Sequence, residues 1–447
     1  MERITIVSAD GHGGASPEMY RPYFDPQYRH YIDELVEENA LWVRRTATFT
    51  GASDEDVYAL IDPDRAMRDG GLSGAWDPQV RLREMDREGV AADVLLPQVN
   101  QASLPFFSGA NIPRPADVRL AGSLAYNRWL ADYLLATEGR VLAAAVPGPC
   151  LDMAGTVGIV EWAADHGFRS LAVPRLIDDP ALPPLQDRYY EPFWSAVEAA
   201  GLVLQLHAGH GVVQGHLFGF LDRLLREHGT QEDMLRELNS APDNPFKVGI
   251  GIAPRRVLWQ LMLGGVFDRH PGLKLVLTEV RADWIPATLA QLDARFERGG
   301  TGLRRRPSEY WQENCYAAVS FMHKAEVAMR SEIGLRQFMF GRDYPHSEGT
   351  WPNTWDWLRD SLQGVPESEA RAILGGNAID CYGLDRAELA AIAGRIGPRP
   401  SDILGRDFAV DPRLVEHFQT RGGYLKDPEE VDLAEVERAF DEDLAYR

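Results

Sequence analysis

The chain has 447 residues, of which 45% are hydrophobic and 25% are charged, a composition typical of a folded, water-soluble protein. No apolar run approaches the ~18 residues that a membrane span needs, and the N-terminus lacks the apolar stretch of a signal peptide, so we expect a cytoplasmic protein. The 46 Lys and Arg residues against 67 Asp and Glu residues give a net charge of −21, which excludes nucleic acid and anionic membranes as general partners.

Short β-branched and apolar runs alternate with longer segments of helical spacing along the first 385 residues. The helical pattern is clear at 118–136, 190–200 and 255–267. The short runs predict eight strands: 4–9, 92–97, 142–146, 170–174, 203–207, 273–279, 315–320 and 337–341. Eight strands with helices between them predict an α/β fold, a (β/α)8 TIM-type barrel whose active site lies at the C-terminal ends of the strands.

Three parts of the chain exceed what the predicted barrel, residues 1–385, requires. Insertions near 17–78 and 210–254 follow the first and fifth strands, so we expect them at the barrel mouth as lids or substrate walls, or else as surface and oligomer contacts. Residues 386–447 form a helical C-terminal extension that is too apolar for a disordered tail. We expect it to pack either on the outer helices of the barrel or on another subunit of a homodimer or higher homo-oligomer, and we favour the contact between subunits.

Candidate metal ligands stand at the ends of three predicted strands. Asp10 and His12 are two positions apart, so on a strand their side chains point to the same face. His207 ends the fifth strand and Asp343 follows the eighth. Each residue taken singly has another explanation, as a turn or helix-capping Asp or as a buried structural His. Because these strand ends meet on one rim of a barrel, the four residues together predict a mononuclear metal site.

Mixed histidine and carboxylate ligands suit zinc, manganese or iron better than calcium or magnesium. Cys150, Cys315 and Cys381 are widely separated, which excludes a zinc site built from cysteines. We expect one divalent ion, with zinc as the first choice and manganese as the alternative. Such an ion lowers the pKa of a bound water and polarises substrate oxygens, and either effect would make the protein an enzyme.

Besides these ligands, five segments resemble the amidohydrolase superfamily, specifically its branch related to aminocarboxymuconate-semialdehyde decarboxylase. They are AYNRWLA at 125–131, AAVP at 144–147, GGVFDRHPGLK at 264–274, DYPH at 343–346 and ILGGNA at 373–378. The resemblance covers about 4–385 and implies a TIM barrel with one metal site.

In that resemblance Asp10 and His12 match the first-strand pair of the family, His207 its fifth-strand histidine and Asp343 its eighth-strand aspartate. Members often carry His or Glu at the position of Asp10. Members that look like this chain include non-oxidative decarboxylases, several kinds of hydrolase and hydratases, so the resemblance does not specify the reaction.

A second departure from the family concerns proton transfer. Many decarboxylases of the group carry a His-Gly-Gly-type segment after strand six, whose histidine handles protons, whereas this chain has Thr278-Glu279-Val280-Arg281. We predict Glu279 as a substitute, either as a base beside the metal or as a partner that orients His207. His210 is the other candidate, as a proton donor or as a structural residue of the rim.

Three residues are predicted to contact substrate. Arg281 is a candidate clamp for a substrate carboxylate, the alternative being an internal ion pair with Asp283 or Glu279. His346 and Trp351 follow the eighth strand and are expected to shape the pocket, Trp351 mainly by packing.

These residues predict a metal-dependent hydrolase that attacks a small cyclic or aromatic substrate, with or without a carboxylate, through metal-bound hydroxide. Asp343 would serve as both ligand and proton acceptor. The alternative is a non-oxidative decarboxylase of an aromatic or enol acid, which the missing histidine after strand six disfavours. A third possibility, from another class, is a non-catalytic barrel that binds a small molecule.

Overall fold

The fold is centred on eight parallel strands, each paired with the next along the chain. The computed structural model describes residues 2–50, 55–97, 104–106, 113–175, 179–211, 216–227, 251–346, 349–405, 408–421 and 431–446. The strands are β1 (Ile6–Gly13), β2 (Val90–Pro97), β3 (Val141–Ala145), β4 (Ser170–Ala172), β5 (Val203–His207), β6 (Leu275–Thr278), β7 (Cys315–Ser320) and β8 (Phe338–Gly341). The eight predicted strands and the (β/α)8 barrel are therefore confirmed.

β1 and β8 close the barrel. Gly11 and Tyr344 form a parallel bridge, the backbone N–H of His12 donates to the Tyr344 carbonyl at 2.7 Å, and the N–H of Asp343 donates to the Asp10 carbonyl at 3.0 Å. These bonds join the two chain segments that carry three of the four predicted metal ligands.

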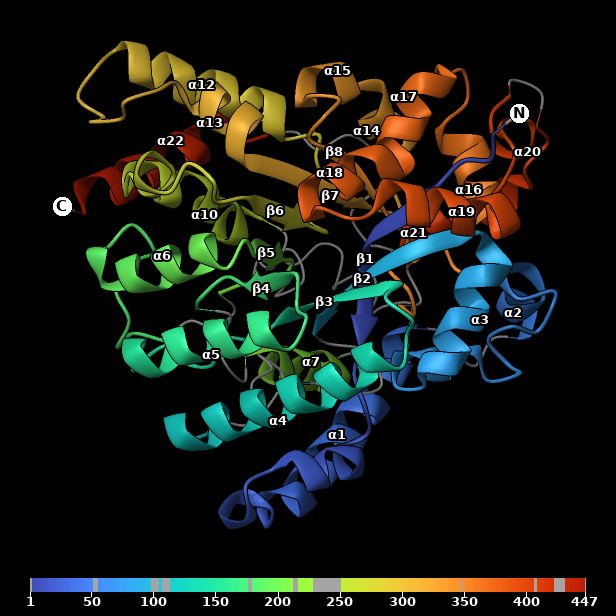
Figure 1. The fold of residues 1–447 in the computed structure, drawn as a ribbon, viewed down its shortest axis with the longest axis horizontal. Helices are drawn as coiled ribbons and strands as arrows, with labels where there is room; N and C mark the ends of the chain where they lie inside the picture. The colour runs from blue at the N-terminus through green and yellow to red at the C-terminus, as the bar shows by residue number, and fades with distance from the viewer. Residues whose placement is uncertain are drawn as a thin grey trace.

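Helices surround the strands, which lie at the centre of the molecule in Figure 1. Between them they cover the outer face of the sheet, which explains why the strands are buried on both faces. The α-helices are α1 (Tyr31–Thr50), α2 (Glu55–Ile61), α3 (Pro78–Glu88), α4 (Ala116–Leu135), α5 (Met153–Asp165), α6 (Glu191–Ala199), α7 (His216–Glu227), α10 (Ile252–Leu263), α11 (Val266–Arg269), α12 (Ile285–Glu297), α13 (Pro307–Asn314), α14 (Lys324–Ala328), α15 (Arg330–Ile333), α16 (Thr354–Ser361), α17 (Glu367–Arg371), α18 (Asn377–Tyr382), α19 (Arg386–Ile396), α20 (Pro400–Ile403), α21 (Pro412–Arg421) and α22 (Leu433–Ala445). None of the helices described is both long and apolar enough to cross a bilayer.

The first expected insertion, near 17–78, contains α1, α2 and three short 3-10 turns, η1 (Pro17–Tyr23), η2 (Pro26–Tyr28) and η3 (Gly71–Ala75). Of the second, near 210–254, the structure describes α7 and the start of α10, whereas 228–250 lie outside the described residues.

Within the described residues, each of the three longer helices of the C-terminal extension contacts the barrel. Leu389 and Ile392 of α19 pack with barrel residues such as Val7 and Val94 near the start of the strands. Leu414 and Phe418 of α21 pack with Phe321, which directly follows β7. Helix α22, drawn in red in Figure 1, lies along α10 and α12. In the described residues the extension packs on its own barrel, which is the alternative to the contact between subunits that we favoured. The dimer stays a prediction.

Candidate metal centre

Six acidic and histidine side chains converge at the C-terminal ends of the strands. They are Asp10, His12, His207, Glu279, Asp343 and His346, which we call the ligand cluster. β1 supplies two of them, β5 one, the residue after β6 one, and the segment after β8 the last two.

The cluster consists of two overlapping sets of donor atoms. Asp10, His12, His207 and Glu279 each offer one ligand atom, and these atoms lie within 4.8 Å of one another. His12 and Glu279 form a second set of the same kind with Asp343 and His346. The four residues predicted as ligands therefore lie together, and two residues predicted for other roles lie among them.

Distances within the cluster show how tightly it is packed. Nε2 of His12 lies 3.0 Å from Oδ1 of Asp343 and 3.8 Å from Oδ1 of Asp10. Nε2 of His207 lies 3.0 Å from Oε2 of Glu279 and 3.7 Å from the same Asp10 oxygen. The His346 ring stacks on the His12 ring with centroids 3.9 Å apart, and its Nδ1 is 3.0 Å from Asp343 Oδ1.

The donor atoms fit a divalent ion. Oδ1 of Asp10, Nε2 of His12 and Nε2 of His207 are buried and lack a well-aligned hydrogen bond within the part of the chain that the structure describes. Nδ1 of His207 is 2.9 Å from the Ala208 carbonyl, to which it donates, so its Nε2 is the nitrogen left to face the cluster. Buried polar atoms rarely go unsatisfied, and a cation would satisfy all three.

The charged groups of the cluster shift one another's pKa values. Burial alone would raise the pKa of the Asp10 carboxyl, but His207, His12 and Ser320 hold it at about 2. Burial opposes a positive charge on His207, yet the carboxylates of Asp10 and Glu279 raise its pKa well above the usual range. Burial, together with the neighbouring histidines, lowers the pKa of His12 well below that range. Burial and the Asp343 carboxylate raise the pKa of Glu279 to about 7.

Backbone conformation directs two of these side chains. Glu279 and Asp343 have φ values of 56° and 57°, in the left-handed region that non-glycine residues seldom adopt, and Arg281 has 60°. Each comes just after a strand. Such conformations cost free energy and persist only where the surrounding structure enforces them. They are common at functional sites.

Ser320 is a contact that the sequence did not reveal. It ends β7, and its hydroxyl donates a hydrogen bond to Oδ2 of Asp10, which leaves Oδ1 toward the cluster. Its position at the tip of a predicted strand was the only available signal, and a serine there carries no chemistry that distinguishes it from a surface residue.

Glu279 lies on the side of His207 that faces the ligand cluster. A partner that orients a ligating histidine contacts the ring nitrogen opposite the metal, and in His207 the Ala208 carbonyl takes that place. Because Glu279 approaches Nε2 instead, its geometry favours the base beside the metal over the orienting partner.

The other two rim residues predicted for chemistry make protein contacts. Arg281 directs its guanidinium at the Asp283 carboxylate, with Nε 3.1 Å from Oδ1 and Nη2 bonded to Oδ2. Nε2 of His210 lies 2.8 Å from the Pro174 carbonyl beyond β4. Neither residue belongs to the two sets of ligand atoms. The geometry matches the ion-pair alternative for Arg281 and the structural alternative for His210, and their roles toward substrate stay predictions.

Trp351 is buried beside the cluster's β8 segment. Its ring packs edge-on against Tyr344 with centroids 4.9 Å apart, and its Nε1 donates to Glu84 at 3.2 Å. These contacts agree with the packing role that was expected as its main contribution.

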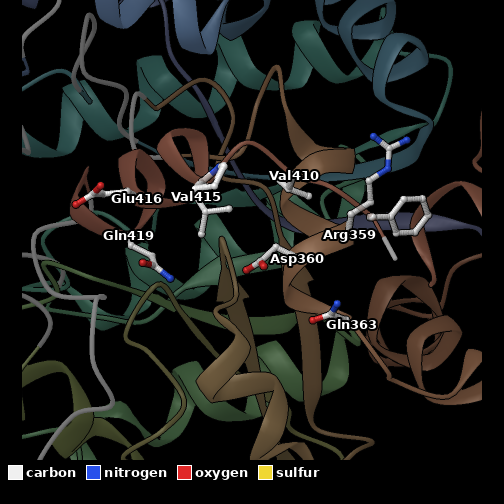
Figure 2. A pocket seen from close by; sticks show the side chains of 9 residues that line it. Arg359, Asp360, Gln363, Val410, Val415, Glu416 and Gln419 are labelled. Atoms are coloured by element: carbon white, nitrogen blue, oxygen red, sulfur yellow. The ribbon is translucent and has the colours of Figure 1, made fainter. Parts of the chain in front are cut away.

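A separate pocket of about 420 Å³ lies between α16 and the segment that includes α21 (Figure 2). Its lining mixes apolar and polar side chains from these two parts: Arg359, Asp360, Gln363, Phe408, Val410, Pro412, Val415, Glu416 and Gln419. None of them belongs to the ligand cluster, and Asp360 is already paired with Lys324 at 3.0 Å. The chemistry therefore points to the ligand cluster rather than to this pocket.

The chain matches a known protein family over most of its length. The family model described as Amidohydrolase matches residues 22–384. A gamma-resorcylate decarboxylase of Rhodococcus jostii is 25% identical over 256 residues, which are 53% of this chain and 65% of that protein. A second one, from Polaromonas, is 24% identical over 329 residues, 68% of this chain and 87% of that protein.

Among solved structures, a dihydroxybenzoic acid decarboxylase from Polaromonas with bound manganese and the inhibitor 2-nitroresorcinol is similar in fold. It superimposes with a TM-score of 0.53 at 18% identity, covering 86% of this chain and 99% of that one. The family match ends just before the C-terminal extension begins.

Proposed function

Because the chain belongs to the amidohydrolase family, we propose that it is a metal-dependent, non-oxidative decarboxylase of an aromatic acid with a hydroxyl group beside the carboxylate. The observation that carries the proposal is Glu279, a largely buried carboxyl that lies among the candidate metal donors and has a raised pKa. The decarboxylase relatives support the same reaction. They favour the alternative over the hydrolase that the sequence put first.

The ion would be held by Asp10, His12 and His207, whose donor atoms belong to one set, with Asp343 of the overlapping set as a further donor and the Glu279 carboxyl beside them. Bound there, it supplies a positive charge that orients the substrate carboxylate and its neighbouring oxygen. Manganese in the Polaromonas structure supports manganese beside the zinc that we expected first.

Decarboxylation requires a proton at the ring carbon that carries the carboxylate. A C–H bond forms, the C–C bond breaks with its electron pair left on the ring carbon, and CO2 leaves, so no oxidant is needed. A general acid works best when its pKa is close to the working pH. In the metal-free protein, burial and the Asp343 carboxylate raise the pKa of the Glu279 carboxyl to about 7, which makes Glu279 the candidate proton donor of the cluster.

The proposal is tested with γ-resorcylate (2,6-dihydroxybenzoate), incubated with protein reconstituted with manganese or zinc. We expect release of CO2 and resorcinol in equal amounts, and no ¹⁸O in the resorcinol when the reaction runs in H2¹⁸O. Glu279→Gln should retain metal but lose most of the CO2 release, since the amide cannot donate the proton in the same way. Absence of CO2 from a panel of hydroxylated aromatic acids, with ¹⁸O incorporated into lactone or amide substrates, would reverse the proposal in favour of the hydrolase.

A further inference from the structure

Four charged side chains form a buried network against the β1 segment of the ligand cluster. They are Arg81 and Glu88 of α3, Asp93 of β2 and Arg342, which precedes Asp343. Three of the four side chains are 0% exposed and that of Glu88 is 3% exposed. Two guanidinium groups and two carboxylates balance in charge, as burial in a protein interior requires.

Arg81 connects this network to His12. Its Nη1 donates to Oδ2 of Asp93 at 2.8 Å, its Nη2 donates to the backbone carbonyl of His12, and its Nε donates to the Gly74 carbonyl at 3.1 Å. The guanidinium therefore fixes the backbone carbonyl of His12, a candidate ligand, by a hydrogen bond.

Arg342 connects the same carboxylate to Asp343. Its Nη2 donates to Oδ2 of Asp93 at 2.8 Å, and its Nη1 donates to Glu88 at 3.1 Å. Its backbone N–H donates to Oγ of Ser8 at 3.1 Å, and that hydroxyl donates to the Asp10 carbonyl at 2.6 Å. The residue before Asp343 is thus fixed to the backbone of another candidate ligand.

Two close approaches complete the arrangement. The Tyr344 ring contacts both guanidiniums, with 4.3 Å from its centroid to Arg81 and 4.7 Å to Arg342. A Cβ on Gly11, between Asp10 and His12, would lie 2.9 Å from Oδ1 of Asp93. The strand that carries two candidate ligands therefore lies directly against the shared carboxylate, and only glycine permits that spacing.

We propose that Arg81 and Arg342, joined through Asp93, are positioning residues that fix the geometry of His12 and Asp343 toward a divalent ion. The inference rests on the proposed function, because it requires the ligand cluster to bind metal. A buried ion network is weak evidence for stability, since apolar residues of similar volume can stabilise as well. Each guanidinium is planar and offers several N–H donors in a fixed geometry, which a lysine ammonium cannot reproduce. The network uses these donors to hold the backbone that carries the candidate ligands.

The test compares Arg81→Lys with a matched control, Arg140→Lys. Arg140 is also a buried arginine and directly precedes β3. It donates to the carbonyls of Val90 and Ala91 in β2 and to Asp86 at 2.6 Å, at the start of β2 rather than at the ligand cluster. Manganese affinity is measured from the paramagnetic resonance signal of free Mn²⁺ during titration, which does not depend on turnover. Loss of a partner that orients metal ligands typically weakens affinity about 10–100-fold, so we expect that loss in Arg81→Lys and an unchanged affinity in Arg140→Lys.

Thermal unfolding of both variants shows whether each is folded, and Arg342→Lys provides the second arm if Arg81→Lys is not. Weaker Mn²⁺ binding in either cluster-side variant at wild-type stoichiometry supports the inference. Equal affinity in the wild type, the folded cluster-side variants and the control overturns it while leaving the proposed function intact. A wild-type protein that binds neither manganese nor zinc overturns both.

Discussion

His207 is the residue on which the candidate metal centre most depends. It is the only candidate ligand from β5, and its ring is oriented by the Ala208 carbonyl so that Nε2 faces Asp10 and Glu279. We expect His207→Ala to lose most of the bound metal without unfolding the barrel, because the side chain lies at a strand end rather than in the apolar core. Metal analysis by mass spectrometry and a thermal melt measure both, with His166→Ala, an exposed histidine that caps α5, as the control. Full metal content in His207→Ala would remove the residue from the site.

Competition between protons and the metal ion for the cluster provides a second test of the metal centre. In the metal-free protein the pKa of His207 is raised well above its usual range by two carboxylates, and burial with Asp343 raises that of Glu279 to about 7. Groups with raised pKa values keep their protons to higher pH, and a metal ion must displace those protons. Metal affinity should therefore rise between about pH 6 and about pH 8, with more protons released per ion at the lower pH. Calorimetric titration in buffers of different ionisation enthalpy measures this release, and a pH-independent affinity would contradict the charge assignment.

A variant of Arg281 distinguishes its two predicted roles, a clamp for a substrate carboxylate and an internal ion pair. Its guanidinium already pairs with Asp283 through two nitrogens, and the Asp283 side chain is 1% exposed. We therefore expect Arg281→Lys, which loses the planar fork, to lower the melting temperature while KM for a carboxylated substrate stays near the wild-type value. A raised KM with unchanged stability would instead support the substrate clamp.

The ligand positions could be predicted because strand alternation and barrel geometry need no side-chain detail. Asp10, His12, His207 and Asp343 follow from which strands end where. The place of Glu279 on the side of His207 that faces the cluster could not, because it depends on a left-handed backbone residue that no periodicity encodes. The Arg81 network was also hidden, since its members lie on three separate elements and meet only after folding.

The positions of the strands were predicted closely, but the residues at which some strands begin or end were not. β5 and β7 match the predicted ranges, whereas β1 runs on to Gly13 instead of stopping at Ala9. The apolar signal ends where Asp10 begins, yet backbone bonds to Tyr344 and Asp343 continue the strand through the polar residues. Tertiary pairing therefore extended β1 beyond its own hydrophobic pattern.

Helix α22 gives a prediction, because one buried carboxylate joins it to α10. Asp443 accepts hydrogen bonds from Arg256 at 2.7 Å, Trp259 at 2.8 Å and Gln260 at 3.0 Å. Removing one partner of a buried pair costs about 3 kcal/mol or more, so Asp443→Ala should lower the free energy of unfolding by about that amount. Asp441→Ala, on the same helix but 52% exposed beside Arg295, should cost less than about 1 kcal/mol. Urea unfolding measures both, and equal effects would show that α22 is not held by this contact.

The whole molecule combines a barrel that matches its family with an extension that the family model does not include. That extension runs from the start of the strands at α19, to the β7 end at α21, to the outer helices at α22. Its apolar content predicted that it would pack, but the surface it contacts could not be predicted, because packing partners far apart in sequence leave no local pattern.

Crystals grown with manganese test whether the ligand cluster holds one divalent ion. Data collected at the manganese absorption edge should show a single strong anomalous peak among Asp10, His12, His207 and the other residues of the ligand cluster. No peak among these residues, or a dominant peak elsewhere, such as in the pocket between α16 and α21, would show that the ligand cluster is not the metal site.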